Sequence, residues 1–334
     1  MTPDVSVVIS TYNRMAQLPG AVEASLSQVA GGAYEIIVVD NNSTDGTREW
    51  VQQRCATAAG RLHYVHEPQQ GLPFARNAGL AHARAPIIAF TDDDVRVAPG
   101  WVNGIRRAFA RHPEIDLVGG RVLPKWPETV PGWFSRLQWA PLALQDKGDQ
   151  PVRIGPENAA PCLIGASFAF RRSVFDRIGP FDVTYTRAQD REIQMRLWRA
   201  GGLGLYDPSI VAWVDVPEDR LTKQYFRFWY TRSGGFASRM RLLDQLDNDG
   251  RLVDPDANGG RRLLGCPAHV YRAALGHAAG WLRSALRGDE AAAFYHENRV
   301  RYHVAYIRTR IGDWRVGHAP AAPPAPHSLS REVS

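Results

Sequence analysis

Four short runs rich in β-branched and other apolar residues alternate with segments of helical length over residues 1–91, and this alternation restricts the fold most. The four runs are Val5–Ser10, Glu35–Asp40, Leu62–His66 and Pro86–Thr91. The helices expected between them cover Met15–Val29 and Leu72–His82. Because the runs are apolar along their whole length, both faces of each strand are expected to be covered. The pattern predicts an α/β fold with a mostly parallel sheet flanked by helices.

The remaining chain completes this first domain, residues 1–220, and adds a helical region. A helix is expected at Trp101–Pro113, a strand at Asp116–Val122, a second strand at Cys162–Phe170 and a helix at Asp190–Ala200. Between the two strands, residues 124–160 are rich in Pro, Gly and Trp and predict a functional loop region. Residues 221–316 predict helices at Lys223–Leu246, Ala268–Leu286 and Ala291–Ile311. The Pro- and Ala-rich tail, residues 317–334, is expected to be disordered.

Positive charge is concentrated in the last third of the chain. Residues 1–220 carry 23 basic and 24 acidic side chains, whereas residues 221–334 carry 17 basic and 10 acidic ones. A nucleic-acid patch is one interpretation, but the basic residues there are interleaved with apolar ones at helical spacing, which suits an anionic membrane surface at least as well. An Arg-rich composition without any partner is the equal alternative, since the chain has only three lysines.

Composition and cysteine usage indicate the compartment. The chain is 44% hydrophobic and 22% charged, has no run near the roughly 20 apolar residues of a membrane span, and begins without a secretory pattern. Cys55, Cys162 and Cys266 are far apart and odd in number, which argues against a disulfide framework or a zinc module. We therefore expect a soluble cytoplasmic protein, with peripheral attachment to the inner face of the membrane as an extension of this expectation.

Polar residues follow three of the expected strands at the point where each strand ends. They are Thr11, Tyr12 and Asn13, then Asp40, Asn41 and Asn42, then Asp92, Asp93 and Asp94. Ligands of open parallel sheets bind beyond the carboxyl ends of the strands. The sequence therefore predicts one binding site at this edge of the sheet.

The three adjacent carboxylates Asp92, Asp93 and Asp94 indicate a cation. Ionising all three at the rim of an apolar sheet is costly unless a cation is present. Carboxylates, water and phosphate oxygens are the ligands that Mg²⁺ and Mn²⁺ prefer. If the strand stays extended, Asp92 and Asp94 point the same way and could share one ion. A solvated acidic turn is the alternative for an isolated triplet.

Seven motifs in order give the chain a resemblance to family 2 glycosyltransferases over roughly residues 5–240. Those of the first hundred residues are Val7–Arg14, Val38–Thr47, Ala75–Gly79 and Asp92–Asp94. The later ones are Gly165–Arg172, Gly179–Asp182 and Gln189–Asp190, the last followed by Arg196 and Gly201. The resemblance implies the GT-A fold, with a nucleotide-binding half at about 1–120 and an acceptor-binding half at about 121–220. It also implies a nucleoside-diphosphate sugar donor, a UDP-sugar being favoured, and a divalent metal, Mn²⁺ or Mg²⁺.

The resemblance assigns roles residue by residue. Donor-binding positions would be Thr11, Tyr12, Arg14, Asp40, Arg76, Asn77, Asp92, Asp93, Gly165 and Ala166. Asp94 would bind the metal directly and Asp92 would face both ribose and metal. Asp190 matches the family's catalytic base, and a base is needed because a sugar hydroxyl is a poor nucleophile. Taken alone, Asp190 could equally complement the dipole of the first helical turn.

Two positions depart from the family pattern. Gln189 stands where a Glu is common, which removes a charge beside Asp190. Asp215 stands where many members have a His near the metal, so it is a candidate third metal ligand. The Gln-x-x-Arg-Trp pattern of processive members is absent, because Gln224 begins only Gln-Tyr-Phe-Arg-Phe. Transfer of a single sugar is expected.

Several aromatic residues are candidate contacts for an acceptor or for a membrane surface. Trp126, Trp133, Trp139 and Gln189 are the acceptor candidates, with ordinary core packing as the alternative for each Trp. Tyr225, Phe226 and their neighbours, with Arg227 and Arg232, form a basic aromatic helix that could lie on a membrane or pack on the first domain.

Together these features predict an inverting, metal-dependent glycosyltransferase that moves one sugar to a hydroxyl of a saccharide or lipid-linked acceptor in polysaccharide or glycolipid assembly. A nucleotidyltransferase of similar architecture is one alternative, although Thr11–Arg14 is not the Gly-rich loop that grips a triphosphate. A non-catalytic membrane-docking scaffold with a degenerate transferase fold is the other.

Overall fold

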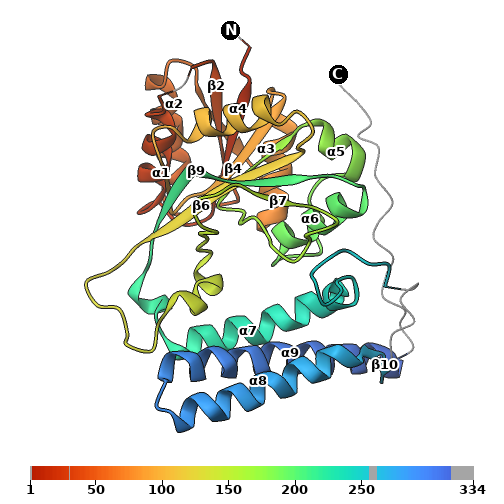
Figure 1. The fold of residues 1–334 in the computed structure, drawn as a ribbon. Helices are drawn as coiled ribbons and strands as arrows, with labels where there is room; N and C mark the ends of the chain where they lie inside the picture. The colour runs from red at the N-terminus through yellow and green to blue at the C-terminus, as the bar shows by residue number, and fades with distance from the viewer. Residues whose placement is uncertain (1, 30, 256–261, 317–334) are drawn as a thin grey trace.

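One mixed sheet of nine strands forms the centre of the first domain in the computed structural model, which describes residues 2–29, 31–255 and 262–316 (Figure 1). The strands run in the order β3-β2-β1-β4-β8-β6-β9-β5, with β7 also paired to β9. Their bounds are β1 (Val5–Thr11), β2 (Tyr34–Asp40), β3 (Leu62–His66), β4 (Ile87–Asp92), β5 (Val95–Val97), β6 (Leu117–Lys125), β7 (Val152–Ile154), β8 (Ser167–Arg171) and β9 (Gly204–Asp215). The first four are mutually parallel, so the predicted parallel half is confirmed.

Helices cover both faces of the sheet, as the apolar strands require. They are α1 (Leu18–Leu26), α2 (Thr47–Thr57), α3 (Leu72–His82), α4 (Trp101–Arg111), α5 (Ser173–Ile178) and α6 (Gln189–Arg199). Alternate residues of β1 enter opposite cores: Val7 packs on the side of α1 and α4, and Val8 on the side of α3. Helix α3 approaches β1 closely, because a Cβ on Gly79 would lie 2.3 Å from a methyl carbon of Val8. The Gly of this motif therefore serves packing.

Strand β8 runs antiparallel between β4 and β6 and begins later than the sequence predicts. The predicted start at Cys162 is wrong, because the backbone of Leu163 bonds to the Gln194 side chain of α6 instead of a strand. Thr91 at the end of β4 pairs with Ser167 at the start of β8. The Thr91 hydroxyl also donates to the carbonyl of Ala166 over 2.9 Å. The turn before β8 is thereby held beside the end of β4.

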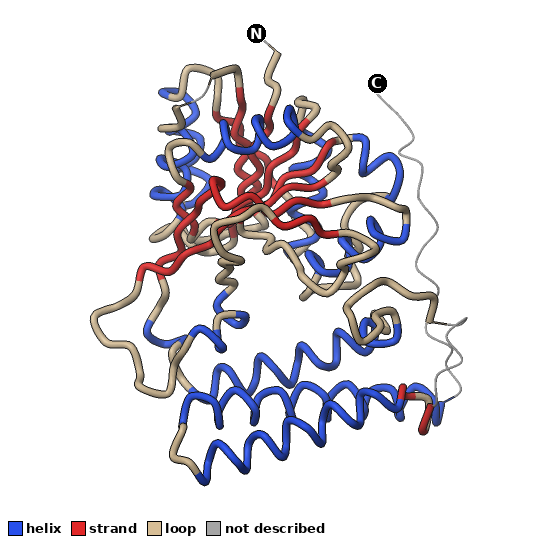
Figure 2. Tube along the Cα trace, viewed as in Figure 1, coloured by secondary structure: helices blue, strands red, loops and turns tan. Residues whose placement is uncertain are grey.

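A layer of three long helices, α7 (Lys223–Arg239), α8 (Ala268–Leu286) and α9 (Glu290–Val316), lies to one side of the sheet domain (Figures 1 and 2). Helix α7 ends before the predicted Leu246 because Arg241 adopts a left-handed backbone, φ 52°, ahead of a short turn at Leu242–Asp244. A small hairpin, β10 (Arg262–Leu263) and β11 (Cys266–Pro267), precedes α8. No helix in the described residues combines the length and apolar character needed to cross a bilayer. The predicted disordered tail, residues 317–334, lies outside the described residues.

A buried carboxylate ties this helical layer together. Asp244 is 4% exposed and accepts the Tyr306 hydroxyl at 2.8 Å and guanidinium groups of Arg262 at 3.0 Å, Arg310 at 3.2 Å and Arg241 at 3.3 Å. Removing the carboxylate charge takes away the compensation that it gives the buried Arg310 and the partly buried Arg241, which is more costly than the loss of one hydrogen bond. The cluster therefore fixes α9 against the end of α7.

We expect Asp244→Asn to lower the free energy of unfolding by about 3 kcal/mol, because it uncouples three arginines from their shared anion. Chemical denaturation followed by circular dichroism measures the change. Asp249→Asn, at an exposed turn nearby, is the matched control and should stay close to wild type. Equal stability of the two variants would contradict the role given to Asp244.

Three histidines lie between α8 and α9. Nδ1 of His277 is 3.0 Å from Nδ1 of His296, and the His277 ring stacks on that of His303 at 5.4 Å. Burial, together with the nearby Arg299 charge, lowers the pKa of His277 to about 4, and burial lowers that of the 3% exposed His303 to about 4 as well. Both rings are therefore neutral in the folded protein at pH 7.

Acid should loosen this contact. In the unfolded chain a His binds its proton near pH 6.5, but folded His303 does so only near pH 4, so its contribution to stability is complete above 6.5 and is lost as the pH falls toward 4. Between pH 7 and 5 we expect a loss of about 2 kcal/mol from His303. Unfolding curves of wild type and His303→Asn over this range test it, since the variant should show the smaller slope with pH. Parallel pH profiles would contradict the assignment.

Candidate active site

The polar ends of β1 and β2 meet at one edge of the sheet, as the sequence predicts. Asp40 is 1% exposed; its Oδ1 accepts the backbone N–H of Ser43 at 2.8 Å and its Oδ2 accepts the Tyr64 hydroxyl at 2.9 Å. Asn13, with φ 49°, bonds to Ser43 and so ties the two loops together. Thr11 is buried at the end of β1, whereas Tyr12 is 47% exposed. This edge therefore holds a buried, fixed carboxylate at the end of β2 and an exposed aromatic side chain just after β1.

The acidic triplet forms a tight turn. Asp92 is the last residue of β4, and Asp93 and Asp94 turn the chain into β5. The extended alternation expected for Asp92 and Asp94 is therefore wrong, because the strand ends between them. Nη1 of Arg14 donates to Asp93 at 3.0 Å and to Asp94 at 2.6 Å. Arg14, predicted beside the nucleotide, is a counter-ion of the turn in this structure.

Burial makes the ionised form of the carboxylates in this turn unfavourable. Burial raises the pKa of Asp93 to about 6; the Arg14 charge opposes the shift and the Asp94 charge adds to it. Burial also raises the pKa of Asp92, against the attraction of a guanidinium on α3. A bound cation would relieve both shifts, and carboxylates are suitable ligands for Mg²⁺ or Mn²⁺. The donor set at Asp92 and Asp94 therefore fits a hard divalent ion.

Arg76 of α3 lies beneath the turn and is 3% exposed. Its Nη2 is 3.3 Å from Oδ1 of Asp92 and 3.3 Å from the carbonyl oxygen of Gly165, and its plane lies over the rings of Phe168 and Phe181. Its buried Nη1 has no hydrogen-bond partner among the described residues. A Cβ on Gly165 would approach the Arg76 guanidinium to 2.6 Å, so a side chain there would displace this group. The orphan donor suits an anionic ligand.

Asp190 contacts Gly165, the residue whose carbonyl lies beside Arg76. It lies in the first turn of α6, which begins after Ala188 in a left-handed conformation, and its Oδ2 accepts the N–H of Gly165 over a long 3.4 Å. Its charge also contributes to the raised pKa of Asp92. Gly165 therefore connects Arg76, through its carbonyl, with Asp190, through its N–H. Gln189, the residue before Asp190, is buried.

Other predicted residues are placed differently. Both groups of the Asn77 amide bond to the backbone of Phe181, so this side chain positions a loop. Asp215 is 53% exposed at the end of β9 and pairs with Nη2 of Arg96 at 3.4 Å. In the part of the chain that the structure describes, no three His, Cys, Asp or Glu side chains are arranged to hold a metal. Val95 of β5 pairs with Val214 of β9, so Asp215 lies next to Asp94 at the ends of these strands, where its carboxylate is paired with Arg96.

The three tryptophans separate into packing and surface positions. Trp133 packs against Phe226 of α7 and Phe294 of α9, with ring centroids 5.4 and 4.8 Å away. Trp139 lies under the Arg136 guanidinium. Trp126 is 39% exposed and its ring meets that of Phe134 edge-on, with centroids 5.1 Å apart, while Trp133 and Trp139 are partly buried. Phe226 and Tyr230 of α7 are buried in the hydrophobic core. The predicted basic aromatic helix therefore packs on the domain through these two rings.

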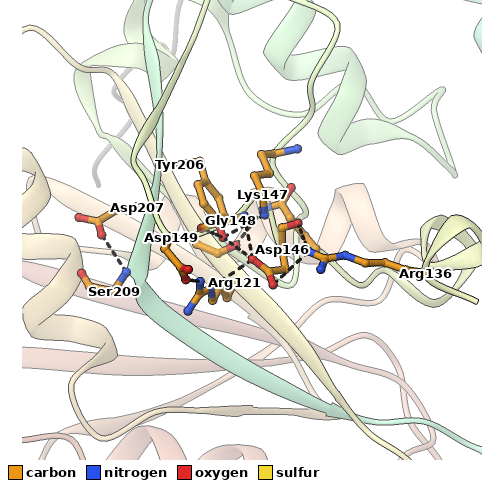
Figure 3. Close-up of polar contacts among 11 residues, drawn as sticks. Arg121, Arg136, Asp146, Lys147, Gly148, Asp149, Tyr206, Asp207 and Ser209 are labelled. Atoms are coloured by element: carbon orange, nitrogen blue, oxygen red, sulfur yellow. Dashed lines mark hydrogen bonds and ion pairs between the residues drawn. The ribbon is translucent and has the colours of Figure 1, made fainter.

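Two cations near Asp190 were not among the predicted site residues. Lys147 and Arg191 form no ion pair with any described residue, and Arg191 donates to the carbonyl of Pro161. Burial lowers the pKa of Lys147; nearby Cys162 opposes this and Arg191 adds to it. Figure 3 shows the Lys147 amine pointing away from Asp146. The loop itself is held by Arg121, which contacts Asp146 and Asp149, and by the Tyr206 hydroxyl. A single lysine in a Pro- and Gly-rich stretch gives no sequence signal.

Comparison with known proteins fixes the family. Residues 6–179 match the model of the family described as glycosyl transferase family 2. This match takes in more than half of the chain. The chain belongs to glycosyltransferase family 2.

The alignments with curated relatives cover only part of each relative's length. A glucosyl-dolichyl phosphate glucuronosyltransferase of Haloferax volcanii is 26% identical over 192 residues, 57% of this chain and 59% of the relative. A pre-mycofactocin glycosyltransferase of Mycobacterium tuberculosis is 28% identical over 244 residues, 72% of this chain and 48% of the relative. The chain thus spans about half the length of the curated relatives it matches.

A solved structure confirms the GT-A fold predicted for this family 2 member. The mannosyltransferase PcManGT of Pyrobaculum calidifontis, solved with GDP-Man and Mn²⁺, superposes with a TM-score of 0.60 at 21% identity. The superposition covers 94% of this chain and 88% of the other. At this identity the likeness concerns the fold.

Proposed function

We propose that the protein is an inverting, metal-dependent glycosyltransferase that transfers one sugar from a nucleoside-diphosphate sugar to an acceptor hydroxyl. The observation that carries the proposal is the arrangement around Gly165. This residue holds Asp190 on one side and Arg76, with Asp92, on the other. The proposed base, Asp190, and the acidic turn that suits a cation therefore lie close together. A one-step displacement requires this, because the base acts on the attacking hydroxyl and the cation on the leaving group. Family membership supports the same reaction.

The donor would lie along the carboxyl edge of the parallel strands. Thr11, Tyr12 and Asp40 would receive the base and ribose, UDP being the favoured nucleotide, and Arg76 would offer its unpartnered Nη1 to the diphosphate. Arg14, Asp93, Gly165 and Ala166 would border the donor, while Asn77 would act through the Phe181 backbone. Oxygen atoms of Asp94 and Asp92 would hold Mn²⁺ or Mg²⁺, which when bound offsets negative charge on the leaving diphosphate.

On the acceptor side, Asp190 would remove the proton of the attacking hydroxyl as the new bond forms. Attack from the face opposite the leaving group in one step inverts the anomeric configuration. Trp126 and Gln189 would border the acceptor. The unpaired cations Lys147 and Arg191 near this base favour an acceptor that carries an anionic group, such as a lipid phosphate, over a neutral saccharide. Asp215 has no role in this scheme beyond its pairing with Arg96.

The proposal extends to where the enzyme works. Residues 221–334 carry 17 basic against 10 acidic side chains, which supports peripheral binding to an anionic membrane on its cytoplasmic face. A lipid-linked acceptor and a membrane-bound enzyme would meet at the same surface.

Donor hydrolysis tests the reaction directly. The purified chain is incubated with UDP-, GDP- and dTDP-sugars and Mn²⁺ or Mg²⁺, and free nucleoside diphosphate is measured. Release from one donor class that stops on chelation of the metal supports the proposal. Release of pyrophosphate from a nucleoside triphosphate would favour a nucleotidyltransferase, and no donor binding at all would favour a non-catalytic scaffold.

A further inference from the structure

Helix α8 is the helix of the layer that lies farthest from the sheet (Figure 1). It packs on α9 through a narrow face that includes Val270 and Gly280, both buried. A Cβ on Gly280 would come within 2.7 Å of the His296 ring, so the two helices are close there. Val270 and Gly280 are the buried residues of α8, and His277 beside them contacts α9, so the covered side of the helix is narrow and its opposite side is exposed.

The face of α8 directed away from α9 is apolar. Leu275, Leu282 and Leu286 are 71, 62 and 79% exposed. Their spacing of seven and four residues puts them on one stripe of the helix, opposite Val270 and Gly280. Alanines fill the turns between them, at positions 278, 279 and 285. Soluble proteins rarely leave a continuous apolar stripe of this kind uncovered without a partner.

Positive charge borders the stripe. Arg272, Arg283 and Arg287 lie along one of its flanks by helical spacing, all exposed, and none forms an ion pair with a described residue. Residues 262–288 contain no Asp or Glu. On the other flank, Trp281 is 43% exposed. A leucine stripe between arginines and a tryptophan has the composition of a helix that lies in a membrane interface.

The charges beside the leucine stripe favour an anionic lipid surface over a second copy of this chain as its partner. Two copies of this chain packed through the same stripe, antiparallel about a two-fold axis, would bring the Arg272 end of one α8 to the Arg283 and Arg287 end of the other. No acidic residue of α8 is present to pair with them, so like charges would meet. An anionic lipid surface instead supplies phosphates at the flank and acyl chains under the stripe.

We infer that the outer face of α8 docks on an anionic lipid surface, with Leu275, Leu282 and Leu286 in the acyl region and the three arginines at the headgroup phosphates. The inference deepens the membrane association proposed above and moves it from α7 to α8. Helix α7 buries Phe226 and Tyr230 in the protein and exposes Phe228 beneath the Arg232 guanidinium, so it offers one exposed ring where α8 offers a stripe of three leucines.

Vesicle co-sedimentation of the full chain tests the inference. Wild type is expected to bind vesicles of 70% phosphatidylcholine and 30% phosphatidylglycerol, with binding reduced at least tenfold in pure phosphatidylcholine. The triple variant Leu275→Ser, Leu282→Ser, Leu286→Ser and the triple variant Arg272→Gln, Arg283→Gln, Arg287→Gln should each lower the partition coefficient at least tenfold. Leu137→Ser, at a 51% exposed leucine outside α8, is the matched control and should bind like wild type.

Separate readouts distinguish the possible failures. Circular dichroism and donor hydrolysis should be unchanged in all variants, because these residues lie outside the site. Vesicle binding that survives both triple variants would overturn the α8 inference while leaving membrane association in place. A wild-type dimer in sedimentation equilibrium that the leucine variant converts to a monomer would also overturn it, in favour of a second copy. If the wild-type protein hydrolyses no donor, the proposed reaction is contradicted and the α8 inference is unaffected.

Discussion

Asp190→Asn is expected to lower the rate of sugar transfer by about 10²–10⁴-fold while the affinity for the nucleotide stays within a few-fold of wild type. The amide keeps the size and the hydrogen bond to Gly165 but cannot accept the proton of the acceptor hydroxyl. The hydrogen bond to Gly165 is the one that Asp190 makes with a predicted donor position among the described residues, and the amide keeps it, so binding of the nucleotide should be spared. Transfer is measured by product formation, and binding by titration calorimetry with the nucleoside diphosphate.

A matched control comes from the loop before α6. Asp182 accepts hydrogen bonds from the backbone and hydroxyl of Thr184 and makes a local turn, so Asp182→Asn should keep most of the activity. If Asp190→Asn retained more than a tenth of the wild-type rate with a saturating acceptor, the base would have to be another residue. Equal losses of transfer and nucleotide affinity would point to a structural effect of the substitution.

Asp94→Asn should have the second large effect, a loss of metal-dependent turnover by about 10²-fold or more. The substitution removes one of the two carboxylates that we propose for the metal, and the remaining amide oxygen is a weaker ligand for a hard cation. Mn²⁺ affinity in the presence of nucleoside diphosphate, followed by electron paramagnetic resonance, should fall in parallel. Because Arg14 loses one of its partners, unfolding curves are needed beside the kinetics.

Asp215→Asn provides the comparison for the metal. Its carboxylate pairs with Arg96 and is 53% exposed, so turnover and Mn²⁺ affinity should stay within a few-fold of wild type. A loss at Asp215 as large as that at Asp94 would restore it as a third ligand. Unchanged metal affinity in Asp94→Asn would contradict the metal assignment.

The sequence was sufficient to predict features that depend on local pattern. Apolar runs followed by polar residues placed Thr11, Asp40 and Asp92 at one sheet edge, because parallel strands must end together. The helices at Leu72–His82 and Ala268–Leu286 agree with the structure to the residue, since side-chain periodicity and flanking residues set their limits.

Features that depend on contacts between distant segments were not predictable. The link from Arg76 through Gly165 to Asp190 joins three segments, and only the packed sheet shows that a side chain on Gly165 would collide with Arg76. The ion pair of Asp215 with Arg96 arises because β5 and β9 are neighbours. The outer face of α8 is likewise visible only once α9 has covered the opposite one.

The antiparallel insertion of β8 between β4 and β6 bears on how such an enzyme can diversify. The ladder between Thr91 and Ser167, with the Thr91 hydroxyl on Ala166, holds the turn of Asp92–Asp94 and the Gly165 segment together without help from the chain between them. Lengthening a loop costs little free energy when its ends are fixed in this way. We expect insertions to be tolerated best in the exposed stretch 127–132, because the later part of this segment supplies the core residues Leu142 and Leu144 and the strand β7.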